Sequence, residues 1–439
     1  MIYFIHYFNI DKTKEGLINM KKNTKDAIII GFALFSMFFG AGNLIFPGYL
    51  GYKLGSQFYI GMIGFVLTGV GLPLLAIIAC SKGDGTFESL ANKIGKKFSI
   101  TFTALIFLAI GPLLAVPRTA ATTFEVAIHP FFPSIPSWII ILIYFIINIF
   151  FVLRESSIID TIGKFLTPAL IVILVILIVK GFIMPIGSIN ESDLTGVLAD
   201  SLLEGYQTMD ALAALLFASI ITFSIKDKGY KGKETSSILL KASLVAAIGL
   251  AFVYGGLTYI GAQTHEIAFA DISKTQLLIL IAKNILGNAG PVLIGVAMGL
   301  ACLTTSIGLI SAGSDFFTKI TNGKLPYKIN ALVISVISFG VALLGVDKIV
   351  VYSAPVLSLL YPVAITMIVF AFIQNYIKIK AARLGVYTSL VFSLLLLIPG
   401  LNLSFLPLAS LGFGWVLPTV LAMVIGQIVF KDNKEIKNK

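Results

Sequence analysis

Gly40-Ala41-Gly42-Asn43-Leu44-Ile45-Phe46-Pro47 lies inside the first long apolar segment of the chain, which runs over about residues 26–47. That segment has about the ~20 residues that a helix needs to cross a bilayer. Two glycines lower helix propensity by about 1 kcal/mol each, and the asparagine adds a polar group at membrane depth. Backbone that leaves a helix inside the bilayer is tolerated where it faces protein or a water-filled cavity. The stretch therefore predicts an interrupted helix and a binding site, with close packing of small residues against another helix as the alternative.

The composition is that of a polytopic membrane protein. Of the 439 residues, 57% are hydrophobic and 12% are charged, whereas a soluble domain has about 25% charged residues. The net charge of +11 comes from basic residues in short loops between apolar segments, so we expect a lipid bilayer and no nucleic acid as partner. Cys80 and Cys302 fall at or within apolar segments, where we expect small apolar fillers and no disulfide.

An apolar window predicts an all-α fold with twelve transmembrane helices. They run approximately over residues 27–50, 57–80, 98–127, 136–153, 162–183, 198–225, 238–262, 289–317, 329–346, 349–374, 385–400 and 404–430. Spans three, six and eight are long, which implies tilt, a break or protrusion from the bilayer.

The basic residues indicate the orientation of these spans. Of the 32 lysines and arginines, 26 fall on the side of the N-terminus and Arg118 lies within span three. The other five are Lys53, Lys180, Lys274, Lys283 and Lys348. By the positive-inside rule, this asymmetry predicts a cell-membrane protein with both termini in the cytoplasm.

A second interruption is predicted in span six, at Glu204-Gly205-Tyr206-Gln207-Thr208-Met209-Asp210-Ala211-Leu212. Acidic and amide groups at membrane depth are costly unless they line a cavity; the alternative is the polar mouth of an ordinary helix. Because the two breaks are five spans apart, spans one to five and six to ten would form inverted repeats with the site between them. The resulting domains are a leader (1–25), two five-helix repeats (26–183 and 184–376), two peripheral helices (377–430) and a tail (431–439).

Span eight carries three neighbouring hydroxyl groups, those of Thr304, Thr305 and Ser306. Hydroxyls in an apolar helix commonly bond the carbonyls one turn earlier in the same helix. Alternatively, together with carbonyls of the broken span one, they suit a small alkali cation.

Three motifs make the chain resemble a known family. They are Phe39-Gly40-Ala41-Gly42-Asn43-Leu44-Ile45-Phe46-Pro47, Val116-Pro117-Arg118-Thr119-Ala120-Ala121-Thr122-Thr123-Phe124-Glu125 and Met209-Asp210-Ala211-Leu212-Ala213-Ala214-Leu215. In this order they resemble the bacterial branched-chain amino-acid carriers of the BrnQ type, over about residues 21–430. The resemblance implies import of leucine, isoleucine and valine by a symporter that is coupled to a cation gradient, usually of sodium. It also implies a distant relation to the LeuT fold, in which a 5+5 inverted repeat is followed by two further helices.

The resemblance to LeuT also implies a substrate site. Its residues would be Phe38, Ala41, Gly42, Asn43, Tyr206, Gln207, Thr208 and Met209. Free amides at the start of the second half of span one would hold the substrate carboxylate, since a helix N-terminus binds anions. Carbonyls at the break in span six would accept from the substrate ammonium. Phe38 and spans three and eight would surround the branched side chain, in a pocket that discriminates one methylene by only about 1–3 kcal/mol.

The implied sodium site combines spans one and eight. Its ligands would be the carbonyls of Ser36, Phe39 and Ala301 and the hydroxyls of Thr304 and Thr305. A register shifted by one, to Cys302, Thr305 and Ser306, is the alternative. A second sodium site of the LeuT type needs an asparagine on span seven, and residues 239–261 contain none.

Arg118, Glu125 and Asp210 are candidate gate residues. Arg118 and Glu125 lie seven residues apart, hence on one helix face. An arginine within a span costs about 2.5–3.5 kcal/mol on insertion scales, so it needs a partner, for which Glu125 and Asp210 are the candidates. A static structural pair is the alternative to a gate.

Other function classes lack their motifs. No GxxxxGK[ST] phosphate loop is present, so we expect neither an ATP-driven pump nor an ATP-binding subunit. No nucleophile and base converge at mid-membrane, so we expect no enzyme and no cofactor beyond the coupling ion. A channel and a proton-coupled carrier are the alternatives. Span five is purely apolar between Lys164 and Lys180, which favours sodium over a proton-coupled relative with a lysine there.

Overall fold

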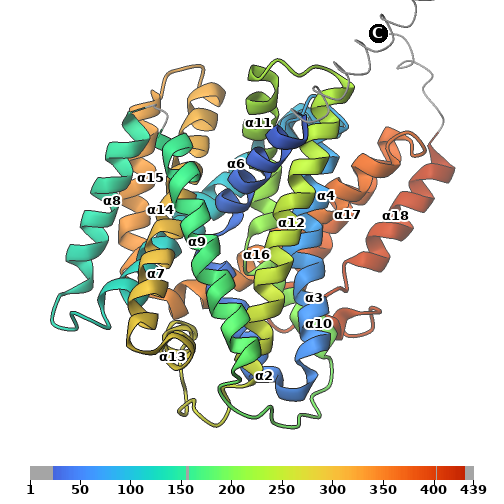
Figure 1. Ribbon diagram of the computed structural model, residues 1–439. Coiled ribbons are helices and arrows are strands. Elements are labelled where there is room, and N and C mark those ends of the chain that lie inside the picture. The colour runs from blue at the N-terminus through green and yellow to red at the C-terminus, as the bar shows by residue number, and fades with distance from the viewer. Residues whose placement is uncertain (1–22, 155–157, 402, 431–439) are drawn as a thin grey trace, which may run out of the picture.

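The computed structural model describes residues 23–154, 158–401 and 403–430, with the backbone alone over 158–167. Most of the predicted leader and the whole predicted tail lie outside these ranges. Within them the chain folds into helices and turns without a strand, as the composition predicts (Figure 1).

The first half of the chain builds a series of partly interrupted helices. They are a helix over residues 23–38, α2 (Ala41–Leu54), α3 (Phe58–Val66), α4 (Leu72–Ser81), α5 (Phe87–Asn92), α6 (Lys96–Leu108), α7 (Ala115–Thr123), α8 (Ser137–Leu153) and α9 (Ile158–Ile183). Three π-helical turns, η2 (Leu67–Gly71), η3 (Ala109–Leu113) and η4 (Phe124–Ile128), continue α3, α6 and α7, and the 3-10 turn η1 (Gly55–Gln57) links α2 to α3. Such π turns are rare and frequently lie at functional sites.

The second half has longer helices. They are α10 (Val197–Tyr206), α11 (Asp210–Asp227), α12 (Lys233–Ala262), α13 (Lys274–Leu286), α14 (Gly290–Ile320), α15 (Tyr327–Ala342), α16 (Val346–Ile373), α17 (Ile379–Leu396) and α18 (Val416–Val429), with 3-10 turns η5 (Gly287–Ala289) and η6 (Ala409–Leu411). The last two long helices, α17 and α18, pack on each other, and α17 packs on α16 at the edge of the bundle (Figure 1). The division into two repeats and a peripheral pair stays a prediction.

Many of these helices are long and apolar enough to cross a membrane. In the described residues six helical stretches meet that test, or seven if the bent pair α10 and α11 counts as one. Four shorter apolar helices of 10–17 residues lie in the same bundle, at Ser137–Leu153, Pro168–Ile183, Tyr327–Ala342 and Val416–Val429. The chain is therefore a multi-pass helical protein, while the count of twelve spans and the inverted repeat remain predictions.

Two features of the outer regions differ from the prediction. Span twelve, predicted over 404–430, is α-helical only from Val416, because the preceding residues turn at Leu408 (φ 66°) and Gly412 (φ 77°). The helix α13, which no apolar window predicts, is capped by Ser273, whose hydroxyl accepts from the backbone N–H of Gln276. Its apolar face, which includes Leu278 and Ile281, is buried against α2 and α14.

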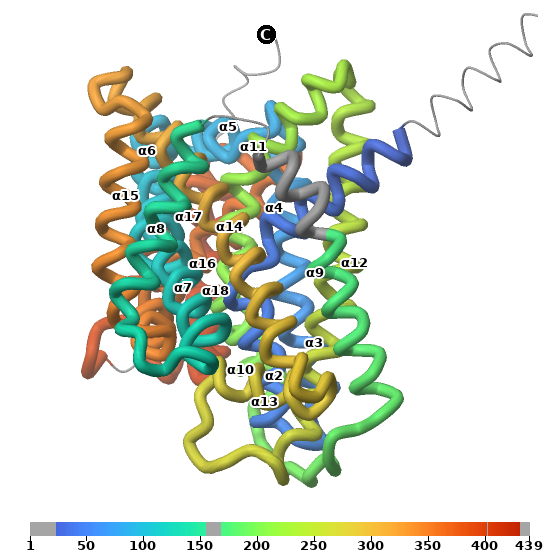
Figure 2. Tube along the Cα trace, turned by 60° about the vertical axis from the view of Figure 1, so that its left-hand side comes forward, coloured from blue at the N-terminus to red at the C-terminus, as the bar shows by residue number. Residues whose placement is uncertain are grey.

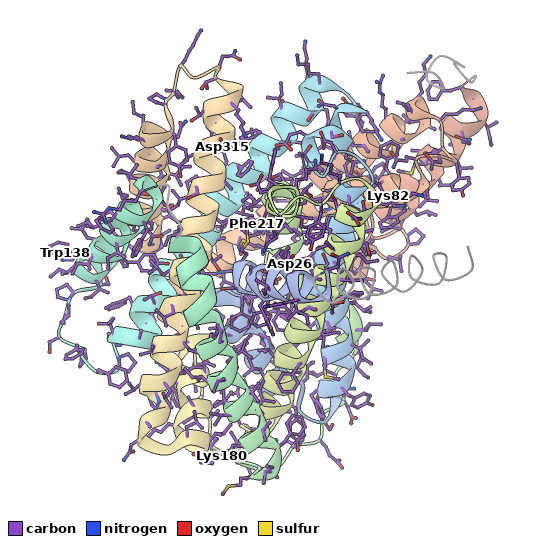
Figure 3. All side chains as sticks on the ribbon, turned by 45° about the horizontal axis from the view of Figure 1, so that its top comes forward. Asp26, Lys82, Trp138, Lys180, Phe217 and Asp315 are labelled. Atoms are coloured by element: carbon purple, nitrogen blue, oxygen red, sulfur yellow. The ribbon has the colours of Figure 1, made fainter. Side chains whose placement is uncertain are left out.

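The bundle has two distinct ends. The N-terminal parts of α13 and α10 lie with the end of α2 at the lower end of the molecule, and the connection from α14 to α15 lies at the upper end (Figure 2). Lys180 and Asp315 mark these opposite ends in Figure 3. Five helical segments meet between the two ends, near the first predicted break. They are the helix over 23–38, α2, α7, α11 and α14.

Candidate functional site

The first helix is interrupted next to the predicted stretch. The helix over 23–38 ends before Phe39, Gly40 is extended (φ −125°, ψ −161°), and α2 begins at Ala41. The side chain of Asn43 stabilises this start, because its Oδ1 accepts from the backbone N–H of Gly40 at 3.1 Å. The break thus lies at Phe39–Gly40, and the amides of Ala41, Gly42 and Asn43 form the open first turn of α2.

Span six is interrupted as well. Helix α10 ends at Tyr206, α11 begins at Asp210, and the two are bent by 40°. Met209 adopts a left-handed conformation (φ 67°), which is unfavourable for a residue with a side chain. The hydroxyl of Thr208 accepts from the backbone N–H of Asp210 at 3.3 Å and so satisfies the first amide of α11. Both predicted interruptions are therefore present, and the alternative of an ordinary helix mouth in span six is wrong.

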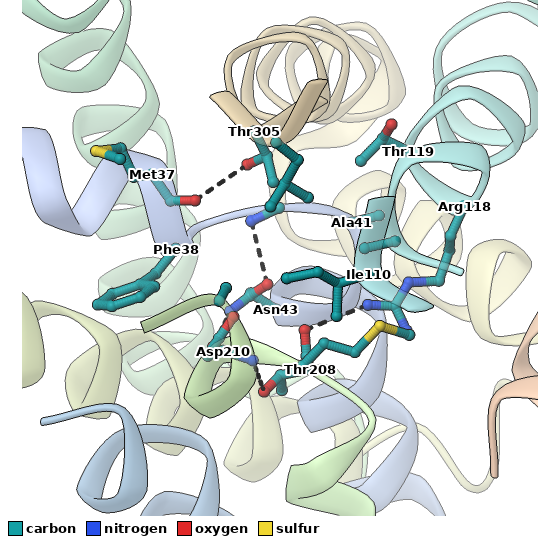
Figure 4. A pocket seen from close by; sticks show the side chains of 15 residues that line it. Met37, Phe38, Ala41, Asn43, Ile110, Arg118, Thr119, Thr208, Asp210 and Thr305 are labelled. Atoms are coloured by element: carbon teal, nitrogen blue, oxygen red, sulfur yellow. Dashed lines mark hydrogen bonds between the residues drawn. The ribbon is translucent and has the colours of Figure 1, made fainter. Parts of the chain in front are cut away.

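The two breaks border one small cavity, which lies between the helix over 23–38, α2, η3, α7, α11 and α14 (Figure 4). Its lining residues are Met37, Phe38, Gly40, Ala41, Asn43, Ile110, Ala115, Arg118, Thr119, Thr208, Met209, Asp210, Ala213, Thr305 and Leu309. The cavity measures about 20 Å³, which is room for about one water molecule. The cavity is therefore too small for an amino acid, and we call this arrangement closed; a ligand of that size needs the surrounding groups to move apart.

Five of the eight residues predicted to bind substrate line this cavity. They are Phe38, Ala41, Asn43, Thr208 and Met209. Gly42 adjoins it, because its α-carbon faces the Arg118 guanidinium, where a Cβ would stand 2.8 Å from Nη2. Tyr206 is directed to α16, where its ring stacks on Tyr361 at 4.0 Å and its carbonyl accepts from the Tyr361 hydroxyl.

The guanidinium of Arg118 donates hydrogen bonds to the carbonyls at the second break. Its Nη1 donates to the Gln207 carbonyl at 2.6 Å and its Nη2 to the Thr208 carbonyl at 3.3 Å. These are two of the carbonyls that the resemblance to LeuT assigned to a substrate ammonium. In the closed state the guanidinium takes that place at the negative end of α10.

Glu125 is not the partner of Arg118. Its carboxylate accepts from the Thr275 hydroxyl at 2.9 Å and from the Val346 backbone N–H at 3.0 Å. Glu125 lies in the π-helical turn η4, beyond the end of α7, and contacts the starts of α13 and α16. Of the three candidate gate residues, only Arg118 and Asp210 line the cavity.

Asp210 is held by a network that the sequence did not reveal. Its Oδ2 accepts from the Asn43 amide at 2.7 Å and from the Tyr254 hydroxyl at 2.8 Å, and Tyr254 also contacts the Asn43 amide. Tyr254 comes from α12, or span seven, which lacks the asparagine of a second sodium site. A fully buried tyrosine within an apolar helix needs a partner for its hydroxyl. That requirement was the only signal in the sequence that Tyr254 belongs to a polar network.

The hydroxyls of span eight separate in the structure. Thr305 Oγ1 lies 3.3 Å from the Phe39 carbonyl and 3.5 Å from the Met37 carbonyl, both at the first break. Thr304 bonds the Ala301 carbonyl of its own helix at 2.9 Å. Ser306 faces α8, where it contacts Asn148 and Tyr144. Thr305, which both registers share, is thus the hydroxyl that reaches span one, and Ser306 of the shifted register does not reach it.

Span three is interrupted as well, which is one of the outcomes that its length implied, although the position of the break was not predicted. The π turn η3 ends in Leu114 (φ −126°, ψ −68°) and contains Pro112, which lacks a backbone N–H. It places Ile110 in the cavity wall and starts α7 at Ala115, so that Arg118 is directed to the second break. The proline was the available signal in the sequence.

Comparison with known proteins identifies the family. Residues 23–433 match the model of the branched-chain amino acid transport protein family. The chain belongs to this family. It is 37% identical over 428 residues to the branched-chain amino acid permease BraB of Bacillus subtilis, with 92% of this chain and 95% of BraB covered. It is 38% identical over 440 residues to a putative branched-chain amino acid carrier protein of Staphylococcus aureus, with 93% and 97% covered.

The fold of this family member is similar to that of solved LeuT-type transporters. Mhp1, a nucleobase-cation-symport-1 family transporter in a closed conformation, gives a TM-score of 0.61 at 14% identity, with 92% of this chain and 91% of Mhp1 covered. MhsT, in complex with L-phenylalanine, gives a TM-score of 0.55 at 17% identity, with 91% and 98% covered. The chain is therefore a multi-pass membrane protein of an amino-acid transporter family, as the three motifs predicted.

Proposed function

We propose that this protein imports leucine, isoleucine and valine together with Na⁺ by alternating access across the cell membrane, with both termini in the cytoplasm. The observation that carries the proposal is the meeting of two broken helices at one buried cavity. Broken helices at the centre of a bundle supply unpaired amides and carbonyls for substrate and ion without exposing them to lipid. The family supports the substrate class, since both relatives described above carry branched-chain amino acids in their names.

The cavity suits a short apolar side chain next to a charged head group. Phe38, Ile110 and Leu309 form apolar walls, whereas Arg118, Asp210 and the first turn of α2 are polar. A cavity with apolar walls and a few converging polar groups is typical of small-molecule sites. Opening of the closed state would let the apolar walls surround the branched side chain.

Sodium is the coupling ion that the oxygen atoms around Thr305 favour. The carbonyls of Phe39 and Met37 and the Thr305 hydroxyl lie together at the first break, and neutral oxygens from an unwound segment suit Na⁺. Proton coupling is the second candidate, and the observation in its favour is the buried carboxylate of Asp210 beside the cavity.

Uptake of radiolabelled leucine into proteoliposomes tests the proposal, with sodium and pH gradients imposed separately. We expect saturable accumulation that follows the sodium gradient, with competition by isoleucine and valine. Accumulation driven by the pH gradient alone would favour the proton-coupled alternative, non-saturating flux would favour a channel, and no flux under any gradient would refute the proposal.

Two protein variants, measured in the same uptake experiment, test where the sodium ion binds. Thr305→Val removes the hydroxyl beside the Phe39 carbonyl, and the Na⁺ concentration for half-maximal uptake should rise about tenfold with the loss of one such contact. Thr304→Val is the matched control, because the Thr304 hydroxyl bonds within its own helix and the shift should be smaller. An equal sodium dependence in both variants and the wild type would place the ion elsewhere.

A further inference from the structure

Two opposite charges line the cavity and do not pair with each other. Arg118 and Asp210 are each only 3% exposed, and both border the same space. The ion pairs shorter than 4 Å among the described residues are Lys228–Asp26 and Lys319–Asp315, both remote from the cavity. Two buried charges that are kept apart are unfavourable, because each has lost its hydration without gaining an ionic partner. Ionisable residues at membrane depth mark ligand or ion pathways.

The guanidinium of Arg118 is placed to receive an anion. Two of its nitrogens donate to the Gln207 and Thr208 carbonyls, and its buried Nε has no hydrogen-bond partner. Its Nη2 also lies directly beside the first turn of α2, since a Cβ on Gly42 would stand 2.8 Å from it. A carboxylate at the open amides of α2 would therefore meet a full positive charge in addition to the helix dipole.

The carboxylate of Asp210 is placed to receive a cation. The side-chain hydrogen bonds that it accepts from Asn43 and Tyr254 come from neutral donors, and both end on Oδ2. Neither donor neutralises its charge. Figure 4 shows Asp210 and Arg118 on different sides of the cavity, with Asn43 and Thr208 between them.

We propose that Arg118 and Asp210 are the two charged ligands of a zwitterionic substrate. Arg118 and the first-turn amides of α2 bind its α-carboxylate, and Asp210 binds its α-ammonium. This assignment rests on the proposed function, because it presupposes an amino acid as substrate. It replaces the carbonyls of Gln207 and Thr208 as the ammonium site, since Arg118 already occupies both. Arg118 and Asp210 thus set specificity for the α-amino-acid head group, and the apolar walls set specificity for the side chain.

Ligands that lack one charge each test the two roles. The probes are leucine, 4-methylpentanoate (leucine without its ammonium) and 3-methylbutylamine (leucine without its carboxylate). Binding of each is measured by calorimetry on the purified full chain in saturating sodium. Asp210→Asn should weaken leucine and the amine about tenfold or more and leave the acid within about threefold. Arg118→Gln should weaken leucine and the acid by the same factor and leave the amine within about threefold.

Glu125→Gln is the matched control, because it neutralises a half-buried, hydrogen-bonded carboxylate that does not line the cavity. It should change the affinities of all three ligands by a common factor. If Asp210→Asn and Arg118→Gln also weaken all three ligands equally, their role is structural and the proposal is overturned.

The wild-type protein decides the matter even if neither variant folds. Both analogues should bind it about tenfold or more weakly than leucine, since each leaves one buried charge unpaired. An analogue that binds as tightly as leucine would overturn the role of the residue assigned to its missing group. A wild-type protein that binds no leucine would instead refute the proposed function.

Discussion

Asn43 uses both ends of its amide group to join the two broken helices. Its oxygen accepts from the Gly40 backbone N–H, and its nitrogen donates to Asp210 at the start of α11. The same side chain therefore fixes the start of α2 and the place of the buried carboxylate. Gly42 in the same turn has a different role, because its missing side chain gives Arg118 room beside the helix.

Gly42→Ala should therefore impair leucine binding without unfolding the protein. An added Cβ would stand 2.8 Å from Arg118 Nη2 and 3.0 Å from the Phe46 ring, so the guanidinium must move. Loss of its charge-assisted hydrogen bonds should weaken leucine binding about tenfold. Gly48→Ala in the same helix is the control, because its Cβ would meet the nearest side chain at an ordinary 3.5 Å. Equal leucine affinity in both variants would contradict this role of Gly42.

At the scale of elements, the broken helix is held in place by glycine contacts with an unbroken one. Helix α2 packs along α12, and Gly51 and Gly261 bring the two backbones together. A Cβ on Gly261 would stand 1.9 Å from the Gly48 carbonyl oxygen, and one on Gly51 would stand 1.9 Å from the Thr258 oxygen. Small residues at such an interface let two helices within a membrane approach closely. The contact also positions Tyr254 of α12 beside Asn43.

Gly261→Ala should destabilise this helix pair, because the added Cβ would collide with backbone atoms of Gly48. Overpacking costs about 1–3 kcal/mol, and here no side chain can turn aside to relieve it. Thermal unfolding of the purified protein should show a lower midpoint for this variant. Gly340→Ala in α15 serves as the comparison, since its Cβ meets nothing within 4 Å and alanine favours a helix. An unchanged midpoint for Gly261→Ala would mean that α2 and α12 approach less closely.

At the scale of the whole molecule, contacts at both ends of the bundle accompany the closed cavity. At one end, Glu125 joins η4 to the starts of α13 and α16. At the other end, Asp26 of the first helix accepts from Lys228 at 3.2 Å and from the Tyr230 hydroxyl at 2.7 Å, beyond the end of α11. Burial and the neighbouring Asp26 carboxylate raise the pKa of Tyr230 to about 12. Tyr230 therefore remains a donor throughout the physiological pH range.

The orientation of the molecule can be tested with single cysteines. Lys53 and Lys324 are exposed, and the native Cys80 and Cys302 are buried, so the background should be low. By the positive-inside rule, an impermeant maleimide should label Lys53→Cys on intact cells and Lys324→Cys only after the membrane is opened. The opposite labelling pattern would invert the proposed topology.

The sequence by itself determined the class of the protein and the places where its helices break. Apolar length, glycine content and polar residues at membrane depth act locally, so they can be evaluated over a few neighbouring residues. The breaks at Gly40 and at Gln207–Met209 follow from these local terms. The three motifs were likewise sufficient to predict the family.

Tertiary structure alone decided which polar groups meet at the breaks. Arg118 bonds carbonyls 89 and 90 positions away, Asn43 reaches Asp210 across 167 positions, and Tyr254 reaches Asn43 across 211. No local preference selects among such partners, because the choice depends on how the helices pack and on which buried groups still need a hydrogen bond. For the same reason the sequence left both Glu125 and Asp210 as candidate partners of Arg118, whereas packing directed Glu125 to the starts of α13 and α16 and left Arg118 and Asp210 facing one cavity.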